Sequence, residues 1–166
     1  TLRSGIPTGG IGTNGTFGGE NADTWGEALF QTLEEALFWV TNYDGPGDTQ
    51  EEKATVIVRG RQILTQNYNI PAGVCLQGSG PDAQIVFQGT GNLFTLVGDD
   101  IRINDIQFTL DNDLPVDCIA IATLGAGGQV QHFSMERCTF NKESASLDWA
   151  FAINATNTAF WSLSNC

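Results

Sequence analysis

A short pattern that recurs three times constrains this chain more than any other feature. It begins at residue 101 as IRINDIQF, at residue 133 as FSMERCTF, and at residue 161, where the sequence ends in WSLSNC. The intervals are about 32 and 28 residues, the range expected of stacked structural repeats. Apolar residues share offsets in three sets: Ile101, Phe133 and Trp161; Ile103, Met135 and Leu163; and Ile106, Cys138 and Cys166.

Each copy begins with strand-like alternation and continues after a two-residue step typical of a bend. One copy is too small to bury its own apolar face, so the copies are expected to stack, with each repeat touching only its neighbours. A second alternating pair precedes each copy, so every repeat should hold at least two strands. These pairs are Phe94/Leu96, Ile119/Ile121 and Phe151/Ile153, and Val74/Leu76 extends the repeat further back.

A helix is predicted near residue 33, ahead of the repeats. Leu33, Ala36, Leu37 and Val40 lie at helical spacing on one face, and Thr32 with Glu35 has the spacing of a capping box. A second box, Thr24 with Glu27, leaves open an earlier helix start or two short turns. Short strands are predicted at 55–58 and 68–70 from their β-branched and aromatic residues.

Two regions follow from this organisation. Residues 1–23 are rich in Gly, Thr and Asn and are predicted to form an extended arm. Residues 24–166 are predicted to form a helix-capped stack of strands that is truncated at, or continues beyond, residue 166. The arm either docks on a neighbouring subunit or assembly, or is a solvated linker.

The charge balance narrows the classes of partner. The 166 residues carry 7 Lys and Arg against 19 Asp and Glu, a formal net charge of −12. That balance argues against binding nucleic acid, since neutralising phosphates requires a basic surface. No apolar run is long enough to predict membrane insertion. A cation such as calcium is compatible with this charge, although no calcium-binding motif is present, and no other cofactor is expected.

Four cysteines are present, at 75, 118, 138 and 166. They form no CxxC motif, and the single histidine, His132, offers too few nitrogen ligands for a zinc site. Cys138 and Cys166 occupy equivalent repeat positions, so stacking would bring their backbones close enough for a disulfide. Buried free thiols are the alternative, and the redox state stays open.

From Thr32 onward the order of these signals resembles the pectin-lyase-like superfamily. Its members commonly begin with a short capping helix such as LEEAL (33–37), followed by a strand and glycine such as TVIVRG (55–60), a stretch such as IPAGVCLQGSG (70–80) and rungs such as 101–108 and 133–140. The resemblance implies an all-β fold: a right-handed single-stranded parallel β-helix, or solenoid, with a short N-terminal capping α-helix. The superfamily includes pectinesterases, polysaccharide lyases, glycosidases and phage tailspikes or tail fibres, so the fold alone does not select a function.

Enzymes of this fold class usually act on glycans with carboxylates projecting from neighbouring rungs. Two outward positions of the repeated octet can be compared between copies. The first holds Asn104, Glu136 and Ser164, and the second holds Asp105, Arg137 and Asn165. Neither position has an acidic residue in more than one copy. An acidic loop holds the remaining candidates for a cation site. These are Asp111, Asp113 and Asp117, for which a solvated turn is the alternative.

Two tryptophans and the single histidine are the remaining side chains that could contact a ligand. Trp149 is the candidate for stacking on a sugar ring, whereas Trp161 lies at an inward offset and is predicted to belong to the core. His132 precedes an inward residue and should point outward, without a nearby nucleophile to activate.

These observations favour a virion surface structural or attachment protein, such as part of a phage tail spike or tail fibre, over an enzyme. We expect a homotrimer located in the virion, joined to other virion proteins through the arm and the helix face, with a host surface glycan as a further partner. A polysaccharide lyase or glycoside hydrolase is one alternative. A bacterial surface adhesin, extracellular or on the cell surface, is the other.

Overall fold

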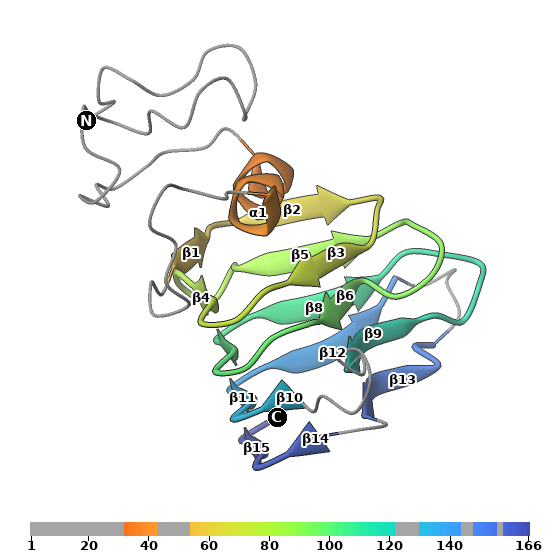
Figure 1. The fold of residues 1–166 in the computed structure, drawn as a ribbon. Helices are drawn as coiled ribbons and strands as arrows, with labels where there is room; N and C mark the ends of the chain where they lie inside the picture. Colours follow the sequence, from red (N-terminus) through yellow and green to blue (C-terminus); the bar gives the residue numbers. More distant parts are fainter. Residues whose placement is uncertain (1–31, 43–53, 122–129, 144–147, 156–157) are drawn as a thin grey trace, which may run out of the picture.

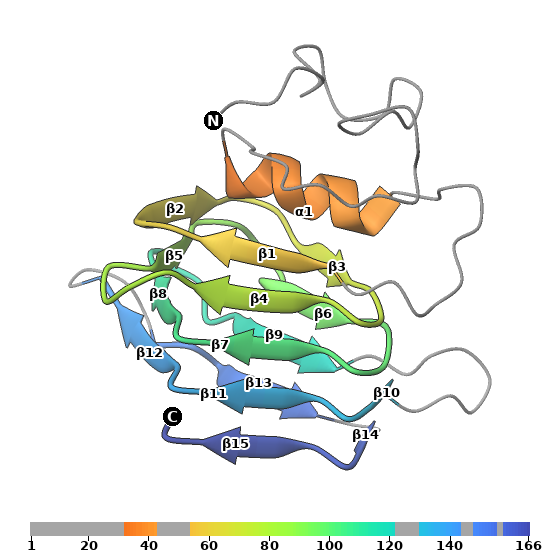
Figure 2. The same cartoon turned by 90° about the vertical axis from the view of Figure 1, so that its left-hand side faces the viewer.

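A computed structural model describes residues 32–42, 54–121, 130–143, 148–155 and 158–166. The predicted arm and the second capping box, Thr24 with Glu27, lie outside these residues. Within the described part, parallel strands stack into a solenoid closed at one end by a helix (Figures 1 and 2). The predicted fold class, a parallel β-helix with a short N-terminal helix, is confirmed.

Three parallel sheets form the walls of the solenoid. Sheet A contains β1 (Thr55–Val58), β4 (Cys75–Gly78), β7 (Arg102–Asn104), β11 (Ser134–Glu136) and β15 (Ser162–Ser164). Sheet B contains β2 (Arg61–Leu64), β5 (Gln84–Phe87), β8 (Gln107–Leu110) and β12 (Thr139–Lys142). Sheet C contains β3 (Tyr68–Ile70), β6 (Phe94–Leu96), β9 (Asp117–Ile121) and β13 (Phe151–Ala155), and a short pair joins β10 (Val130–Gln131) to β14 (Thr158–Ala159).

One strand from each sheet makes a rung. Rung 1 is β1 to β3, rung 2 is β4 to β6, rung 3 is β7 to β9, rung 4 is β11 to β13, and β15 belongs to rung 5. Leu76 pairs with Ile103, which pairs with Met135, which pairs with Leu163. The offsets read from the repeated pattern therefore give the register of sheet A correctly.

The repeated octet contains two strands rather than one strand and a bend. In the first copy β7 ends at Asn104, Asp105 adopts a left-handed conformation with φ of 57°, and β8 begins at Gln107. Arg137 and Asn165 adopt the same conformation in the next two copies, with φ of 51° and 53°. In rungs 3 and 4 a single left-handed residue thus turns the chain from sheet A into sheet B.

The core runs down the axis of the solenoid. Inward side chains stack in columns, as where Ile85, Phe108 and Phe140 pair in successive strands of sheet B. Phe108 is fully buried, with its ring 5.5 Å from that of Phe140 in a stacked arrangement and 6.1 Å from that of Phe94 edge-on. Such columns bury each rung against the next, which stabilises strands that would be unstable alone.

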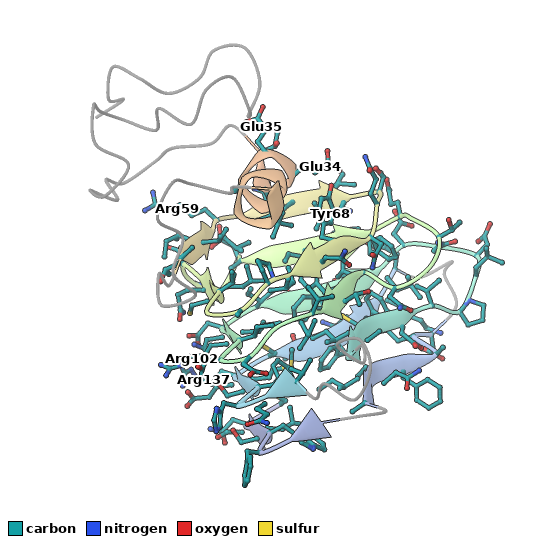
Figure 3. The ribbon with its side chains drawn as sticks, viewed as in Figure 1. Glu34, Glu35, Arg59, Tyr68, Arg102 and Arg137 are labelled. Carbon is teal, nitrogen blue, oxygen red and sulfur yellow. The ribbon has the colours of Figure 1, made fainter. Side chains whose placement is uncertain are left out.

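Helix α1 (Leu33–Asn42) closes the first rung, lying across the end of the stack in both views (Figures 1 and 2). Leu33, Ala36 and Leu37 are buried against the strands, as their spacing predicts. The backbone N–H of Glu35 donates to Thr32 Oγ1 at 3.2 Å, so the predicted N-cap is present. The Tyr68 hydroxyl donates to Glu34 at 3.0 Å and joins the helix to β3 (Figure 3).

Two expectations about the C-terminal rungs are wrong. Ile153, not Phe151, pairs with Ile119, and Phe151 pairs with Asp117 instead. A slip of two residues keeps each side chain on its own face, so alternation alone does not distinguish the two registers. Trp161 occupies the inward column of Ile101 and Phe133 but is 46% exposed, because no further strand of the described residues lies beyond β15.

Candidate functional site

A hollow of about 440 Å³ lies where sheet A turns into sheet B. It forms because rung 2 makes this turn with the longer Gly78 to Pro81 segment, whereas rungs 3 and 4 turn at a single residue, Asp105 or Arg137. The longer turn therefore stands beside two shorter ones and leaves a recess. Its lining is Gly78, Gly80, Pro81, Ala83, Asp105, Ile106, Gln107, Arg137 and Thr139.

The two charged side chains of the hollow bind each other. Arg137 Nε donates to Asp105 Oδ1 at 2.5 Å and Arg137 Nη2 donates to Asp105 Oδ2 at 2.9 Å, a bidentate pair between rungs 4 and 3. The hydrogen bonds from Arg137, and after them the one from Gln77, lower the pKa of Asp105 to about 2. The same pair raises the pKa of Arg137. Asp105 is therefore ionised at neutral pH, and a proton-transfer role would require a much higher pKa.

Amides extend this pair into a chain of contacts across three rungs. Gln77 Nε2, in rung 2, donates to Asp105 Oδ2 at 2.8 Å, and Asn104 Nδ2 donates to Gln77 Oε1 at 3.3 Å. Arg137 also forms an ion pair with Glu136 beside it. The polar groups at this corner therefore join successive rungs to one another.

A second left-handed column marks the opposite edge of sheet A, where each rung turns from sheet C into sheet A. Gly73, Asp100, His132 and Phe160 occupy it, with φ between 56° and 73°. The rings of His132 and Phe160 stack with their centroids 5.7 Å apart and an interplanar angle of 26°. His132 Nδ1 lies 3.4 Å from Asp100 Oδ1 on the preceding rung. His132 points outward, as predicted, and does so as part of an aromatic pair.

Polar side chains cover the outer face of sheet A between these two corners. One outward column contains Thr55, Cys75, Arg102, Ser134 and Ser162, and the next contains Ile57, Gln77, Asn104, Glu136 and Ser164, so the apolar Ile57 and the thiol of Cys75 interrupt the polar surface near the helix-capped end. Arg102 and Arg137 project on the same side of the solenoid (Figure 3). We refer to this surface as the sheet A face.

Trp149 has structural contacts that its sequence context did not predict. Its indole Nε1–H donates to the carbonyl of Asn141 at 2.9 Å, and its ring lies nearly parallel to that of Phe87, with centroids 6.5 Å apart. The side chain packs against the core and is partly buried. One ring face and the N–H are thus already used within the protein, and its role in stacking on a sugar stays a prediction.

The acidic loop does not gather its carboxylates. Asp111 accepts a hydrogen bond from Gln88 at 2.6 Å, Asp117 accepts one from Asn154 at 2.7 Å, and Asp113 is exposed. In the part of the chain that the structure describes, no three His, Cys, Asp or Glu side chains form a group that could hold a metal ion. The cation-site hypothesis therefore has no support from these three residues.

All four cysteines are free thiols in the structure. Cys118 and Cys138 are buried, and burial raises the pKa of both, in the case of Cys138 to about 11. Cys166 is exposed on the last described rung, at the position equivalent to that of Cys138 on the rung before it. The buried pair therefore behaves as core residues with low thiolate content at neutral pH.

Comparisons with protein-family models, with curated proteins and with solved structures found no match. Among the described residues, no helix is long and apolar enough to cross a membrane.

The features at both corners of sheet A were missed as functional groups, although one signal for each is present. Asp105 and Arg137 share an offset in the repeated octet, which places them on adjacent rungs once the register is fixed. Phe160 precedes Trp161 as His132 precedes Phe133, so the same comparison of offsets aligns the two rings. Gly73 and Asn165, which favour a left-handed backbone, occupy one position in each of these columns, whereas Arg137 and Phe160 adopt it without such a preference.

Proposed function

We propose that this chain is a virion surface structural or attachment protein, a β-helical part of a tail spike, tail fibre or related phage particle component. The observation that carries the proposal is the contact chain Gln77–Asp105–Arg137, in which the charged groups that line the hollow join three rungs. Groups held in this way stiffen a rod. They do not need to move or to exchange protons, as catalytic carboxylates do.

The resemblance to the pectin-lyase-like superfamily is part of this proposal. The helix-capped parallel solenoid is compatible with it, and the virion-attached members of that superfamily also place a Gly- and Thr-rich arm ahead of a capped β-helix. We propose a homotrimer in the virion, attached to other virion proteins through the arm and the helix face. An enzyme acting on glycans and a bacterial adhesin are the competing functions.

Native mass spectrometry at micromolar concentration tests the assembly. We expect a mass three times that of the 17.8 kDa chain, and monomer alone would contradict the trimer. The Asp105→Asn variant removes the ion pair with Arg137 between two rungs. It should therefore lower the stability of each solenoid while leaving surfaces elsewhere unchanged. Release of reducing ends or unsaturated sugars from acidic or neutral polysaccharides by the wild-type chain would overturn the non-enzymatic function.

A further inference from the structure

Two of the four cysteines lie at equivalent positions on adjacent rungs. Cys138 follows β11 and Cys166 follows β15, the neighbouring strand of sheet A. Each comes directly after a left-handed corner residue, Arg137 or Asn165. The strands stay in register to their last residues, and beyond them the Arg137 N–H donates to the Ser164 carbonyl at 2.9 Å. The backbone therefore follows the same path through both turns, one rung apart.

This register brings the two cysteines within reach of a disulfide. Paired strands lie about 4.8 Å apart, and a disulfide joins residues whose Cα atoms are about 4.4–6.8 Å apart. The two thiols also point the same way, because each contacts a carbonyl oxygen of the rung before it. Cys138 Sγ lies 3.6 Å from that of Ile103, and Cys166 Sγ lies 3.7 Å from that of Met135. Rotation of each thiol about its Cα–Cβ bond, toward the other, shortens the gap between the sulfur atoms.

The column that holds these two cysteines belongs to the core. The Thr139 N–H donates to the Ile106 carbonyl at 3.1 Å, so Ile106 of rung 3 stands at the position that Cys138 occupies in rung 4. Both side chains are buried. Burial raises the pKa of Cys138, and the neighbouring thiol of Cys166 raises it further, as expected of two thiols in one column.

The other two thiols lie elsewhere in the rungs. Cys118 lies in β9 of sheet C, and within one rung a whole strand of sheet B separates that wall from the corner that Cys138 occupies. Cys75 lies in β4 and faces outward beside Arg102. Neither shares the column of Cys138 and Cys166.

We propose that Cys138 and Cys166 form an oxidisable cross-link site that ties rung 4 to rung 5. The oxidant is a low-molecular-weight disulfide, such as oxidised glutathione. A bond forms between the two cysteine sulfurs as the sulfur–sulfur bond of the glutathione disulfide breaks, and two electrons and two protons pass from the cysteine thiols to give two glutathione thiols. The inference rests on the register of the rungs and is independent of the proposed function.

Chain length favours a different pairing in the unfolded chain, which provides the test. Cys118 and Cys138 are 20 residues apart, whereas Cys138 and Cys166 are 28 apart, and the shorter loop costs less to close. The reduced chain is oxidised with oxidised glutathione in concentrated urea, and again after the urea has been diluted in the same redox buffer so that the chain refolds. Free thiols are then blocked with iodoacetamide, and disulfide-linked peptides are identified by mass spectrometry.

We expect folding to reverse the preferred pairing. In urea, the Cys118–Cys138 linkage should exceed the Cys138–Cys166 linkage, by less than about twofold because closure depends weakly on loop length. In the refolded chain, Cys138–Cys166 should exceed every other linkage by about tenfold or more, because a disulfide in poor geometry is strained. This linkage closes a 28-residue loop and should raise the melting temperature by about 5–15 °C.

Variants assign the effect to this pair, with oxidised and reduced samples of each variant compared with each other. Cys166→Ser should abolish the difference in melting temperature between the two samples. Cys75→Ser is the matched control and should keep the difference, because Cys75 lies in an outward column. Cys118→Ala should be less stable in both samples, since it loses a buried thiol, and should also keep the difference.

Three results would overturn the proposal: the refolded chain lacks the Cys138–Cys166 linkage, the linkage lowers the melting temperature, or Cys75→Ser abolishes the difference as Cys166→Ser does. None of these results bears on the assembly, which the native mass tests separately.

Discussion

Phe108 offers the sharpest test of the packed core. Its side chain is fully buried in rung 3, between Phe94 edge-on and Phe140 in a stacked arrangement, so truncation removes contacts with rungs 2 and 4 together. Replacing a buried Phe with Ala costs about 3–5 kcal/mol, through lost transfer free energy and the cavity left behind. Native domains are stable by only about 5–15 kcal/mol, so Phe108→Ala should lose roughly a fifth or more of that total.

Thermal and urea unfolding followed by circular dichroism measure the change in melting temperature and in the free energy of unfolding. At roughly 2–4 °C per kcal/mol for a domain of this size, the melting temperature of Phe108→Ala should fall by about 6–20 °C. Phe108→Leu, which fills more of the cavity, should lose less than Phe108→Ala. Phe151→Ala is the control, since Phe151 is 59% exposed and its loss should change the free energy of unfolding by about 0.5 kcal/mol or less. A Phe108→Ala variant as stable as this control would refute the packing described here.

Three further predictions concern the backbone, the ion pair and the thiols. Gly78→Ala would place a Cβ 1.8 Å from the Asp105 carbonyl oxygen and should lower the free energy of unfolding by about 3 kcal/mol or more. Gly91 has open space around it but a φ of +87°, so Gly91→Ala should lower it by only about 1–2 kcal/mol. Urea unfolding of both variants checks this order. The pKa of Asp105 is about 2 when folded, below the value of about 3.9 for an unfolded Asp, so its carboxylate stabilises the fold above that range and the contribution is lost as pH falls toward 2. The stability difference between wild type and Asp105→Asn should therefore shrink on acidification, and a difference that stays constant would exclude the pair. Iodoacetamide under native conditions should alkylate exposed Cys166 before buried Cys118, as read by peptide mass mapping; equal rates would contradict the burial of Cys118.

Much of the fold was predictable because inward side chains repeat at fixed offsets. Leu76, Ile103 and Met135 align in the structure as they do in the sequence, since each alternates with polar neighbours and each must face the same core. In rungs 3 and 4 the sheet B strand was not predicted as a separate strand, because a single left-handed residue makes the turn into it. Asp105 and Arg137 make that turn in a left-handed conformation that the sequence gives no reason to expect of an arginine.

The candidate site was less predictable because it depends on register between rungs. The Asp105–Arg137 pair and the His132–Phe160 stack each join residues about one repeat apart, so neither is a local motif. The slip of two residues at Phe151 has the same cause, since both registers keep the apolar residues on one face. The contact of Trp149 with Phe87, two rungs away, was likewise not predictable, because it has no counterpart in the local sequence.

The parallel, in-register stacking of rungs is the claim on which the rest depends, and inter-strand nuclear Overhauser effects test it most directly. Along sheet A, the account predicts contacts between the amide proton of Ser134 and the α-proton region of Ile101 and Arg102, and equally between Ser162 and Phe133, because these backbones are hydrogen-bonded in the same direction. Gln77, Asn104, Glu136 and Ser164 should give a continuous series of neighbours. Short α-proton to α-proton contacts between sequential strands, the mark of antiparallel hairpins, would contradict it.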